Sequence, residues 1–562
     1  MPALHQWDYL FAIGLLASAL DAFMIGANDV ANSFATSVSS KSLTLRQAVL
    51  AAAVMEFGGA VLVGARVTST IKDGIVSGSV FQGNAGVQLL GFTVAIVSSS
   101  IWLSIATRMS WPVSTTYSLV SAVAGIGIAT GGFDAPNWGW NNGKGLATIF
   151  AGFGIAPGIS GGFAIVLYMF IKYAVLLRDN PTRWGLLTAP VIFFLVGAVL
   201  TMAIIYKGAP SLGLKSLDDA SLAAAICGTA AVVALLSVLF WMPYVHAKVV
   251  KKDYTLRWYH FFLGPLLWKR QAPADAEEKD LAVPDYRLNP DSQEPAVTEK
   301  ASETDSEKGD KFSDSPKPAA APKESKLSEV EQHPIEGAWI EPKNLWIIVR
   351  YRALPFIKKI LLHGSSVDVA ALQANHKSVG DIHSRAKVYP NSTEHLYSFM
   401  QVMTACVASF AHGANDVSNA IGPFSVIYHT WSTGTVSGSS TKVHIWALAF
   451  GGGMLVLGLA TYGYNIMAVL GNRITLHSPS RGFCMELAAS ITVILASQYG
   501  LPVSTTMCIT GATVGVSLCN GDWRATNWRA IGWIFLGWVM TVPIVCTFSA
   551  CLMAIILNAP NF

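Results

Sequence analysis

Twelve apolar runs, most of them close to the length of a membrane span, constrain the fold of this chain more than any other feature. A helix needs about 20 mostly apolar residues to cross the hydrocarbon core of a bilayer. Charge is scarce around these runs, because 44 of the 72 charged residues lie between Val245 and His395. We therefore predict an all-α polytopic membrane protein with about 12 transmembrane helices. The runs are 8–27, 46–66, 88–107, 113–131, 146–175, 186–206, 220–244, 396–416, 443–465, 482–499, 502–519 and 530–557.

Lys and Arg in the short loops set the predicted orientation, because cytoplasmic loops carry an excess of them. If the N-terminus is extracellular, the basic clusters after the first and fifth runs, such as Lys41 with Arg46 and Arg178 with Arg183, are cytoplasmic. Four lysines do not fit this orientation, because it places them on the extracellular side: Lys72, Lys144, Lys207 and Lys215. We predict that both termini are extracellular and that the long polar segment, 246–395, is cytoplasmic.

The polar segment 246–395 separates an N-terminal transmembrane half, 1–245, from a C-terminal half, 396–562. Its first part, "KVVKKDYTLRWYHFFLGPLLWKR", and a later stretch, 345–362, mix basic and apolar residues. Both suit the membrane surface beside anionic lipid, although packing against the membrane helices is an equal alternative. The middle, about 271–335, is rich in Pro, Ser and charged residues, so we predict that it is disordered and open to kinases.

The composition argues against several kinds of site. All seven cysteines lie in apolar runs and none forms a C-x-x-C pair. We therefore predict neither a disulfide framework nor a thiolate metal site. We also predict no cofactor and no nucleic-acid partner.

The chain contains an internal duplication. The heptads "GANDVAN" and "GANDVSN", an "FGG" triplet and a "PVSTT" segment each occur twice in the same order. The first copy, about 8–131, begins outside and the second begins in the cytoplasm, so the two repeats are inverted. Polar breaks in the apolar helices of inverted repeats indicate a secondary transporter with its site near the midplane, built from broken or re-entrant helices. The copies lie at 26–32 and 413–419, 57–59 and 450–452, and 112–116 and 502–506.

The "PVSTT" segments have the chemistry of an anion site. Proline favours the first turn of a helix, where free N–H groups and the helix dipole attract anions. The hydroxyls that follow can donate to a tetrahedral oxyanion. In a single copy, bonds back to helix carbonyls would be the favoured interpretation, whereas two copies in symmetric repeats favour the anion site. We assign phosphate binding to Ser114, Thr115, Thr116, Ser504, Thr505 and Thr506.

The heptads place Asp29 and Asp416 inside apolar runs. A bare carboxylate within the membrane costs at least ~2.5 kcal/mol, so it must be paired, protonated or bound to a cation. No Lys or Arg occupies a matching position in both repeats, and Na⁺ with oxygen ligands fits the requirement. The alternative is an aspartate that only caps a broken helix. We assign Na⁺ to Asp29, Asp416, Asn32 and Asn419, and additional phosphate contacts to Asn28 and Asn415.

Two glutamates within the runs break the symmetry of the repeats. Glu56 precedes the first "FGG" and Glu486 precedes the second "PVSTT"; the corresponding positions in the opposite repeats are Ala449 and Ile96. We assign both glutamates to ion coupling. His412 is also unmatched and is an accessory candidate, although such histidines are more often satisfied polar groups than ligands.

These motifs resemble those of the inorganic phosphate transporter (PiT) family. The resemblance rests on "GANDVAN", "HGANDVSNAIGP" and both "PVSTT" segments, and it covers both membrane halves, about 400 residues. It implies twelve spans, extracellular termini, a large cytoplasmic loop and two Na⁺ per phosphate. The family's signature aspartates fall on Asp29 and Asp416, and its important glutamates on Glu56 and Glu486. The first 48 residues resemble fungal plasma-membrane Na⁺/phosphate symporters, so we expect the plasma membrane as the location.

The predicted function is therefore Na⁺-coupled symport of phosphate by alternating access, without enzymatic activity. A proton-coupled phosphate or sulfate symporter is the alternative. An intramembrane aspartyl protease, which also needs two membrane aspartates, is a remote one, because those enzymes use a G-x-G-D or Tyr-Asp context and this chain has G-A-N-D twice. Phosphate, Na⁺ and the lipid bilayer are the expected partners, and the sequence is compatible with a homodimer.

Overall fold

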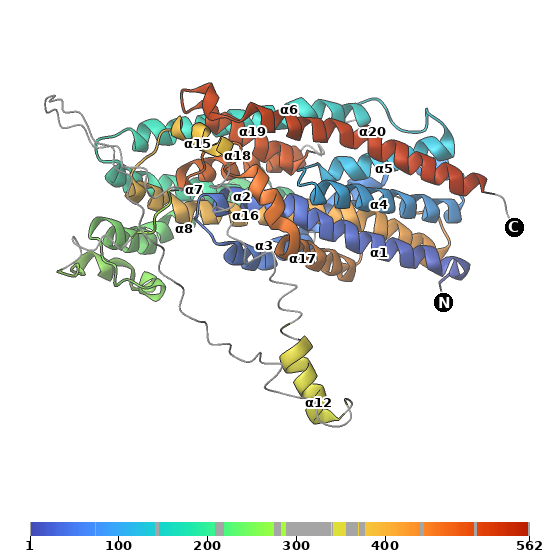
Figure 1. The fold of residues 1–562 in the computed structure, drawn as a ribbon, viewed down its shortest axis with the longest axis horizontal. Coiled ribbons are helices and arrows are strands. Elements are labelled where there is room, and N and C mark those ends of the chain that lie inside the picture. The colour runs from blue at the N-terminus through green and yellow to red at the C-terminus, as the bar shows by residue number, and fades with distance from the viewer. Residues whose placement is uncertain are drawn as a thin grey trace, which may run out of the picture.

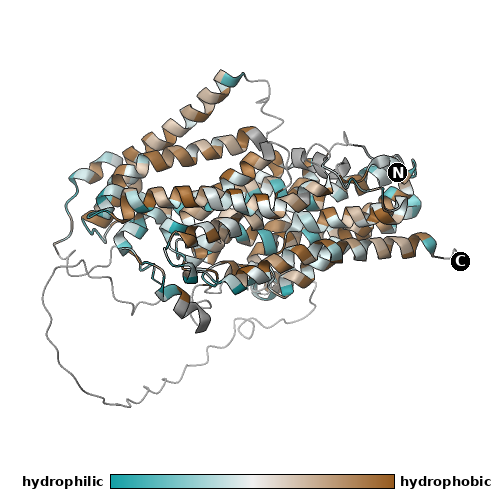
Figure 2. Ribbon diagram, turned by 90° about the horizontal axis from the view of Figure 1, so that it is seen from above, coloured by the Kyte–Doolittle hydropathy of each residue, from teal (hydrophilic) through white to brown (hydrophobic). Residues whose placement is uncertain are grey.

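The computed structural model describes most of the chain as a long bundle of helices (Figure 1). Within the described residues, helices and short turns account for the regular structure, and there is no strand. The described ranges are 2–73, 75–140, 145–207, 218–274, 283–287, 339, 341–353, 355, 369, 377–438, 443–498 and 503–559. Apolar residues recur along the whole length of the helices, as a membrane-spanning bundle requires (Figure 2).

Each of the twelve apolar runs contains helix over most of its length. Eight helical segments are long and apolar enough to span a membrane, namely His5–Ser39, Leu45–Gly64, Ala85–Arg108, Leu146–Leu176, Pro181–Ile205, Asp219–Val250, Ile445–Leu470 and Trp528–Asn558. The other four runs lie in α5 (Thr115–Gly131), α16 (Asn391–Thr433), α18 (Pro479–Gln498) and α19 (Thr505–Leu518). Among the described residues, eight of the twelve runs therefore lie in helices with the length and composition of a membrane span.

Several of the spanning segments are built from more than one helical element. The first consists of α1 (Asp8–Ile25), a π-helical turn η2 (Gly26–Val30) and α2 (Ala31–Ser39), and the sixth consists of α8 (Asp219–Leu236), η8 (Ser237–Trp241), α9 (Met242–Val245) and η9 (His246–Val250). The remaining long helices are α3 (Leu45–Asp73), α4 (Ala85–Arg108), α6 (Leu146–Ile171), α7 (Pro181–Lys207), α17 (Ile445–Leu470) and α20 (Trp528–Asn558).

The two heptad-bearing segments run in opposite directions. The backbone N–H groups of Ala3 and Leu4, just before α1, donate to the carbonyls of Ser432 and Trp431 near the end of α16. The Trp431 indole also donates to the Asp8 carboxylate over 2.7 Å. The start of α1 therefore lies beside the end of α16, as inverted repeats require.

Close glycine contacts join each heptad to the opposite repeat. A Cβ on Gly26 would lie 1.9 Å from the Leu455 carbonyl oxygen, and one on Gly413 would lie 2.1 Å from that of Glu56. One turn away, Gly458 faces Phe23 and Gly59 faces Phe410, with corresponding distances of 1.8 and 2.2 Å. Small residues at such crossings allow two helix backbones to approach closely. Thus α1 packs on α17 just as α16 packs on α3.

This packing corrects one element of the predicted repeat. The contacts make Glu56 equivalent to Leu455, and Gly59 equivalent to Gly458, rather than matching the two "FGG" triplets. Glu56 therefore has a leucine, not Ala449, at its corresponding position. The two "FGG" triplets therefore do not occupy equivalent positions. The feature that α3 and α17 share is a single glycine at the helix crossing, Gly59 in α3 and Gly458 in α17.

The second half of each repeat is a helical hairpin. Figure 1 shows α4 and α5 in the half of the bundle that contains both termini, and α18 and α19 in the other half. The short helices α5 and α19 begin at the "PVSTT" segments, so the hairpin tips point toward the middle of the bundle. These are the re-entrant elements that the sequence predicts.

The duplication extends one helix beyond its predicted limit at residue 131. A Cβ on Gly125 of α5 would lie 2.3 Å from the Cys546 carbonyl oxygen of α20. In the same way, one on Gly515 of α19 would lie 2.5 Å from the Gly161 carbonyl oxygen of α6. The helix that follows each hairpin therefore covers the hairpin of the other repeat.

The polar segment is described only in part. Its helical elements are η10 (Trp258–Lys269), α12 (Pro342–Ile347), η11 (Ile348–Ala353) and α15 (Lys377–Ser384). Most of 271–335, with the serines predicted to attract kinases, and most of 354–376 lie outside the described residues. Residues 283–287 are described, and there the Tyr286 N–H donates to the Asn391 side chain over 3.0 Å.

Candidate functional site

Asp29 connects the two hairpins. It lies in the π-helical turn η2, a type of helix irregularity that is frequent at functional sites. One of its carboxylate oxygens accepts from the Thr115 hydroxyl at the start of α5, and the other accepts from the Thr506 hydroxyl at the start of α19. A single buried carboxylate thus holds a hydroxyl from each "PVSTT" segment.

The last asparagine of each heptad reaches across to the other repeat. The Asn32 amide donates to Thr506 over 2.7 Å and to Asp29 over 3.0 Å. The Asn419 amide donates to Thr116 over 3.1 Å and to Thr115 over 3.3 Å. Each heptad therefore binds the "PVSTT" hydroxyls of the opposite repeat, and the two halves of the site interlock.

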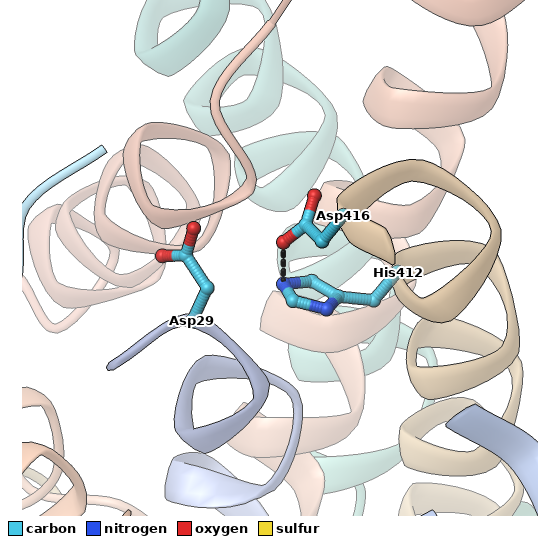
Figure 3. A group of neighbouring side chains, drawn as sticks. All are labelled: Asp29, His412 and Asp416. Carbon is cyan, nitrogen blue, oxygen red and sulfur yellow. Dashed lines mark ion pairs between the residues drawn. The ribbon is translucent and has the colours of Figure 1, made fainter. Parts of the chain in front are cut away.

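Asp416 lies in a second cluster, on α16. Its carboxylate is 2.8 Å from His412 Nε2, and the other ring nitrogen of His412 is 2.9 Å from the Glu56 carboxylate. Ser409 also donates to Glu56 over 2.9 Å, and Thr505 lies 3.1 Å from His412. Figure 3 shows the imidazole directed at Asp416, with Asp29 on the facing segment. His412 is therefore a central member of the site, where it pairs with two carboxylates.

Glu486 lies in a separate nest of donors. Its carboxylate accepts hydrogen bonds from Thr36, from Ser37 over 2.5 Å, from Gln401 over 3.2 Å and from Thr404 over 2.7 Å. None of these four partners belongs to a repeated motif. Gln401 and Thr404 are polar residues within the apolar run 396–416, whereas Thr36 and Ser37 lie outside the predicted runs. A cavity of about 30 Å³, lined by Glu486, His412, Thr505 and Asn32 among others, lies between this nest and the aspartates.

Two of the predicted phosphate ligands, Asn28 and Asn415, form hydrogen bonds with neighbouring groups of the chain. The Asn28 amide donates to the Thr107 hydroxyl and the Trp111 carbonyl, while its oxygen accepts from the Val113 N–H. These bonds, of 3.0 to 3.1 Å, fix the α4–α5 hairpin tip and use the whole amide. Asn415 instead donates to Asp416 over 3.0 Å. Both asparagines therefore position neighbouring groups in this structure.

Comparison with known proteins identifies the family to which this chain belongs. The model of the phosphate transporter family matches residues 25–549. The chain belongs to the phosphate transporter family. It is therefore a membrane transporter and not an enzyme.

Individual relatives of this phosphate transporter extend over its whole length. It is 42% identical to the phosphate-repressible phosphate permease of Neurospora crassa, with 100% of this chain and 99% of the relative aligned. It is 29% identical to sodium-dependent phosphate transporter 2 of Xenopus laevis, with 98% of each chain aligned. A solved structure titled "The sodium-dependent phosphate transporter" is similar with a TM-score of 0.59 and 25% identity, over 98% of this chain and 100% of that one.

Among the described residues, the transporter has one group of three or more His, Cys, Asp or Glu side chains that could hold a cation. Side-chain atoms of Asp29, His412 and Asp416 all lie within 4.8 Å of one another, and all three residues are buried. Two carboxylates this close repel each other in a medium of low dielectric, and a bound cation would relieve that repulsion. Oxygen ligands are abundant here, since Thr115, Thr506 and Asn32 adjoin Asp29.

The serines of the two "PVSTT" segments differ. The Ser114 hydroxyl accepts from the Tyr117 N–H over 3.3 Å and so caps α5. Ser504 stands at the start of α19 and is buried, yet its hydroxyl has no hydrogen-bond partner among the described residues. Such an unsatisfied group calls for an explanation, and an oxyanion at the α19 terminus would supply a partner. Pro502, the proline of this segment, lies two residues before Ser504 and outside the described residues.

Proposed function

We propose that the protein is a Na⁺-coupled phosphate symporter that works by alternating access. The observation that carries the proposal is the position of Asp29, whose two oxygens hold Thr115 and Thr506 from opposite hairpins. Those hydroxyls belong to the helix termini with anion-site chemistry. A cation at Asp29 and an anion at the helix termini would therefore share the same threonines.

This sharing provides a coupling mechanism. While Asp29 has no cation, it accepts the Thr115 and Thr506 hydrogens and withdraws these donors from an anion. When Na⁺ binds, the carboxylate and the threonine oxygens become its ligands, and the hydroxyl hydrogens turn outward. The free hydroxyls and the N–H groups of α5 and α19 can then donate to phosphate. Na⁺ binding thus prepares the phosphate site, and the anion in turn offsets the positive charge.

The inverted repeats support alternating access to this site. Each heptad binds the hairpin of the other repeat through Asn32 or Asn419. Movement of one repeat relative to the other would exchange equivalent contacts on the two sides, as in transporters built from inverted repeats. The site would then open to one side of the membrane at a time.

Proton coupling is the second candidate, and one observation favours it. His412 contacts both Glu56 and Asp416, so a protonated imidazole would be a fixed cation beside the aspartates. In that case a proton would perform the role that we assign to one Na⁺. The two mechanisms require different driving ions, which makes them separable by experiment.

Uptake of radiolabelled phosphate by the purified full-length protein in liposomes tests the proposal. We expect an inward Na⁺ gradient at constant pH to raise initial uptake at least tenfold over a choline gradient. A pH gradient without Na⁺ should give little uptake. Uptake that follows the pH gradient and ignores Na⁺ would contradict Na⁺ coupling and favour the His412 mechanism.

Thr506→Val is expected to lower Na⁺-driven phosphate uptake by about 100-fold, or ~2.7 kcal/mol. The substitution keeps the shape of the side chain but removes the hydroxyl that joins Asn32 and Asp29. Thr510→Val is the matched control, because the Thr510 hydroxyl only donates to its own helix over 2.8 Å. Equal uptake by the two variants would remove Thr506 from the mechanism.

We further propose a plasma-membrane protein with extracellular termini and a cytoplasmic polar segment. The sequon at Asn391 tests this orientation. It is expected to stay unglycosylated, since the segment is proposed to face the cytoplasm and the Asn391 amide already donates to the Pro284 carbonyl over 2.7 Å. A mobility shift on glycosidase treatment that disappears in Asn391→Gln would reverse the orientation.

A further inference from the structure

The segment from Val250 to Ala274 folds back on the membrane helix that precedes it. Gly264 makes this possible, because it adopts a positive φ of 50° and because a side chain there would lie 3.1 Å from the Leu239 carbonyl oxygen. Two buried residues, Leu256 and Leu267, then pack on Ala247. The 3-10 helix η10 is thus attached to the end of the helix Asp219–Val250, at the boundary of the membrane-spanning region.

The outer side of η10 is strongly apolar and uncovered. Trp258, Phe262 and Leu266 are 77%, 71% and 68% exposed. They are exposed although polar residues that could face the solvent instead lie nearby in the sequence. Large apolar side chains exposed together on one short segment indicate an interaction site. At the end of a membrane helix, the acyl chains of the bilayer are available to cover it, and aromatic residues favour that boundary.

A basic cavity adjoins this apolar surface. It has a volume of about 590 Å³, and Lys251, Lys252, Lys269 and Arg270 contribute its charged lining. The Lys251 ammonium donates to the Trp268 carbonyl over 2.7 Å and to that of Arg270 over 2.8 Å, which holds the two ends of the segment together. The cavity is therefore a built feature of the fold-back.

One acidic residue reduces the charge of the cavity only in part. Asp253 pairs with the Arg270 guanidinium over 2.7 Å. Burial acts to raise the pKa of Asp253, but hydrogen bonds from Thr255 and Arg270 outweigh it and lower that pKa. Asp253 is therefore ionised at neutral pH and balances Arg270. Lys251 and Lys269 therefore leave the described lining of the cavity with a positive charge.

We propose that the segment 250–274 binds one anionic phospholipid, with its phosphate headgroup in the lysine-lined cavity and its acyl chains against the apolar side of η10. The proposal depends on the chain spanning a membrane and not on what it transports. Electrostatic attraction contributes roughly fivefold in affinity per basic residue near an anionic membrane surface. An anionic lipid would place its phosphate in the basic cavity and cover the apolar side of η10 with its acyl chains. A soluble phosphate would leave the apolar side uncovered.

Binding of a short-chain fluorescent phosphatidylserine to the purified full-length protein, followed by thermophoresis, tests this proposal. We expect phosphatidylserine to bind at least tenfold more tightly than the matching phosphatidylcholine. Lys252→Gln with Lys269→Gln should weaken phosphatidylserine binding by about 25-fold. The control removes the same charge elsewhere, as Arg178→Gln with Arg183→Gln, and should leave binding unchanged.

A further variant separates a lipid site from a site for free phosphate. Phe262→Ser should weaken both lipids by roughly tenfold, because it removes an apolar contact and no charge. Equal affinities for the two lipids, unchanged binding in the lysine variant, or unchanged binding in Phe262→Ser would each overturn the proposal. Full displacement of the lipid by inorganic phosphate at similar concentration would also overturn it, since it would indicate a soluble ligand.

Discussion

Asp29→Asn is expected to abolish Na⁺-driven phosphate uptake, with a loss of at least 100-fold, or ~2.7 kcal/mol in transport barrier. The Asp29 carboxylate accepts from Thr115 and Thr506 and lies in the one group that could hold a cation among the described residues. Asparagine has nearly the same shape but lacks the charge, and its amide nitrogen would face a hydroxyl donor. The cation site and the exchange of threonine hydrogens should both fail. Initial uptake rates in liposomes measure the effect.

Asp416→Asn is expected to give a similar loss, because it removes the second carboxylate and the ion pair with His412. Asp21→Asn is the matched control. Asp21 is a fully buried aspartate on α1, but no hydrogen bond connects it to a hairpin tip among the described contacts. It should retain uptake within a few-fold. Full uptake by both site variants, with normal yield and elution on gel filtration, would eliminate the cation-site proposal.

The sequence allowed the site to be predicted where both repeats carry the same letters. Asp29, Asn32, Asn419 and the threonines of both "PVSTT" segments lie together, because a broken helix and a helix start have strong local signatures. Inversion then requires equivalent segments to meet near the centre. For this part of the site, local chemistry and symmetry were sufficient.

The rest of the site depends on contacts that leave no local pattern. Asn28 has the same position in its heptad as Asn415, yet it braces the hairpin tip through Thr107 and Trp111. The nest around Glu486 combines α2, α16 and α18, and none of its hydroxyls belongs to a motif. His412 was the weakest candidate, since a single histidine shows its importance only when two carboxylates are placed beside it.

The fold shows the same division between local and long-range information. Run length predicts helices well, and each of the twelve runs contains helix over most of its length. Run length does not separate a full span from a hairpin arm, because the runs 113–131 and 502–519, which contain α5 and α19, are nearly as long as the runs that span. That distinction depends on where the chain reverses, and on α6 and α20, which cover the hairpins from opposite repeats.

Gly59→Ala is expected to reduce phosphate uptake at least tenfold and to lower thermal stability, because its Cβ would lie 2.2 Å from the Phe410 carbonyl oxygen. The obstacle is backbone, so α3 and α16 must separate, and overpacking of this kind costs roughly 1–3 kcal/mol. The movement would also separate Glu56 from His412, which these two helices carry. Liposome uptake and the melting temperature of the purified protein measure the two effects.

Gly58→Ala is a demanding control for this prediction, because it makes the same change one residue away on the same helix. A Cβ on Gly58 meets nothing within 4 Å, and alanine favours the helix by about 1 kcal/mol over glycine. The inverted repeat supplies a second pair, since Gly458→Ala should behave like Gly59→Ala and Gly453→Ala, which also has nothing within 4 Å, like Gly58→Ala. If alanine is harmless at both 59 and 458, the two helix crossings are not the fixed contacts on which the site is built. If alanine lowers uptake at only one of these two positions, the two crossings do not contribute equally to the site. The crossing that tolerates alanine would then be the one that opens during transport.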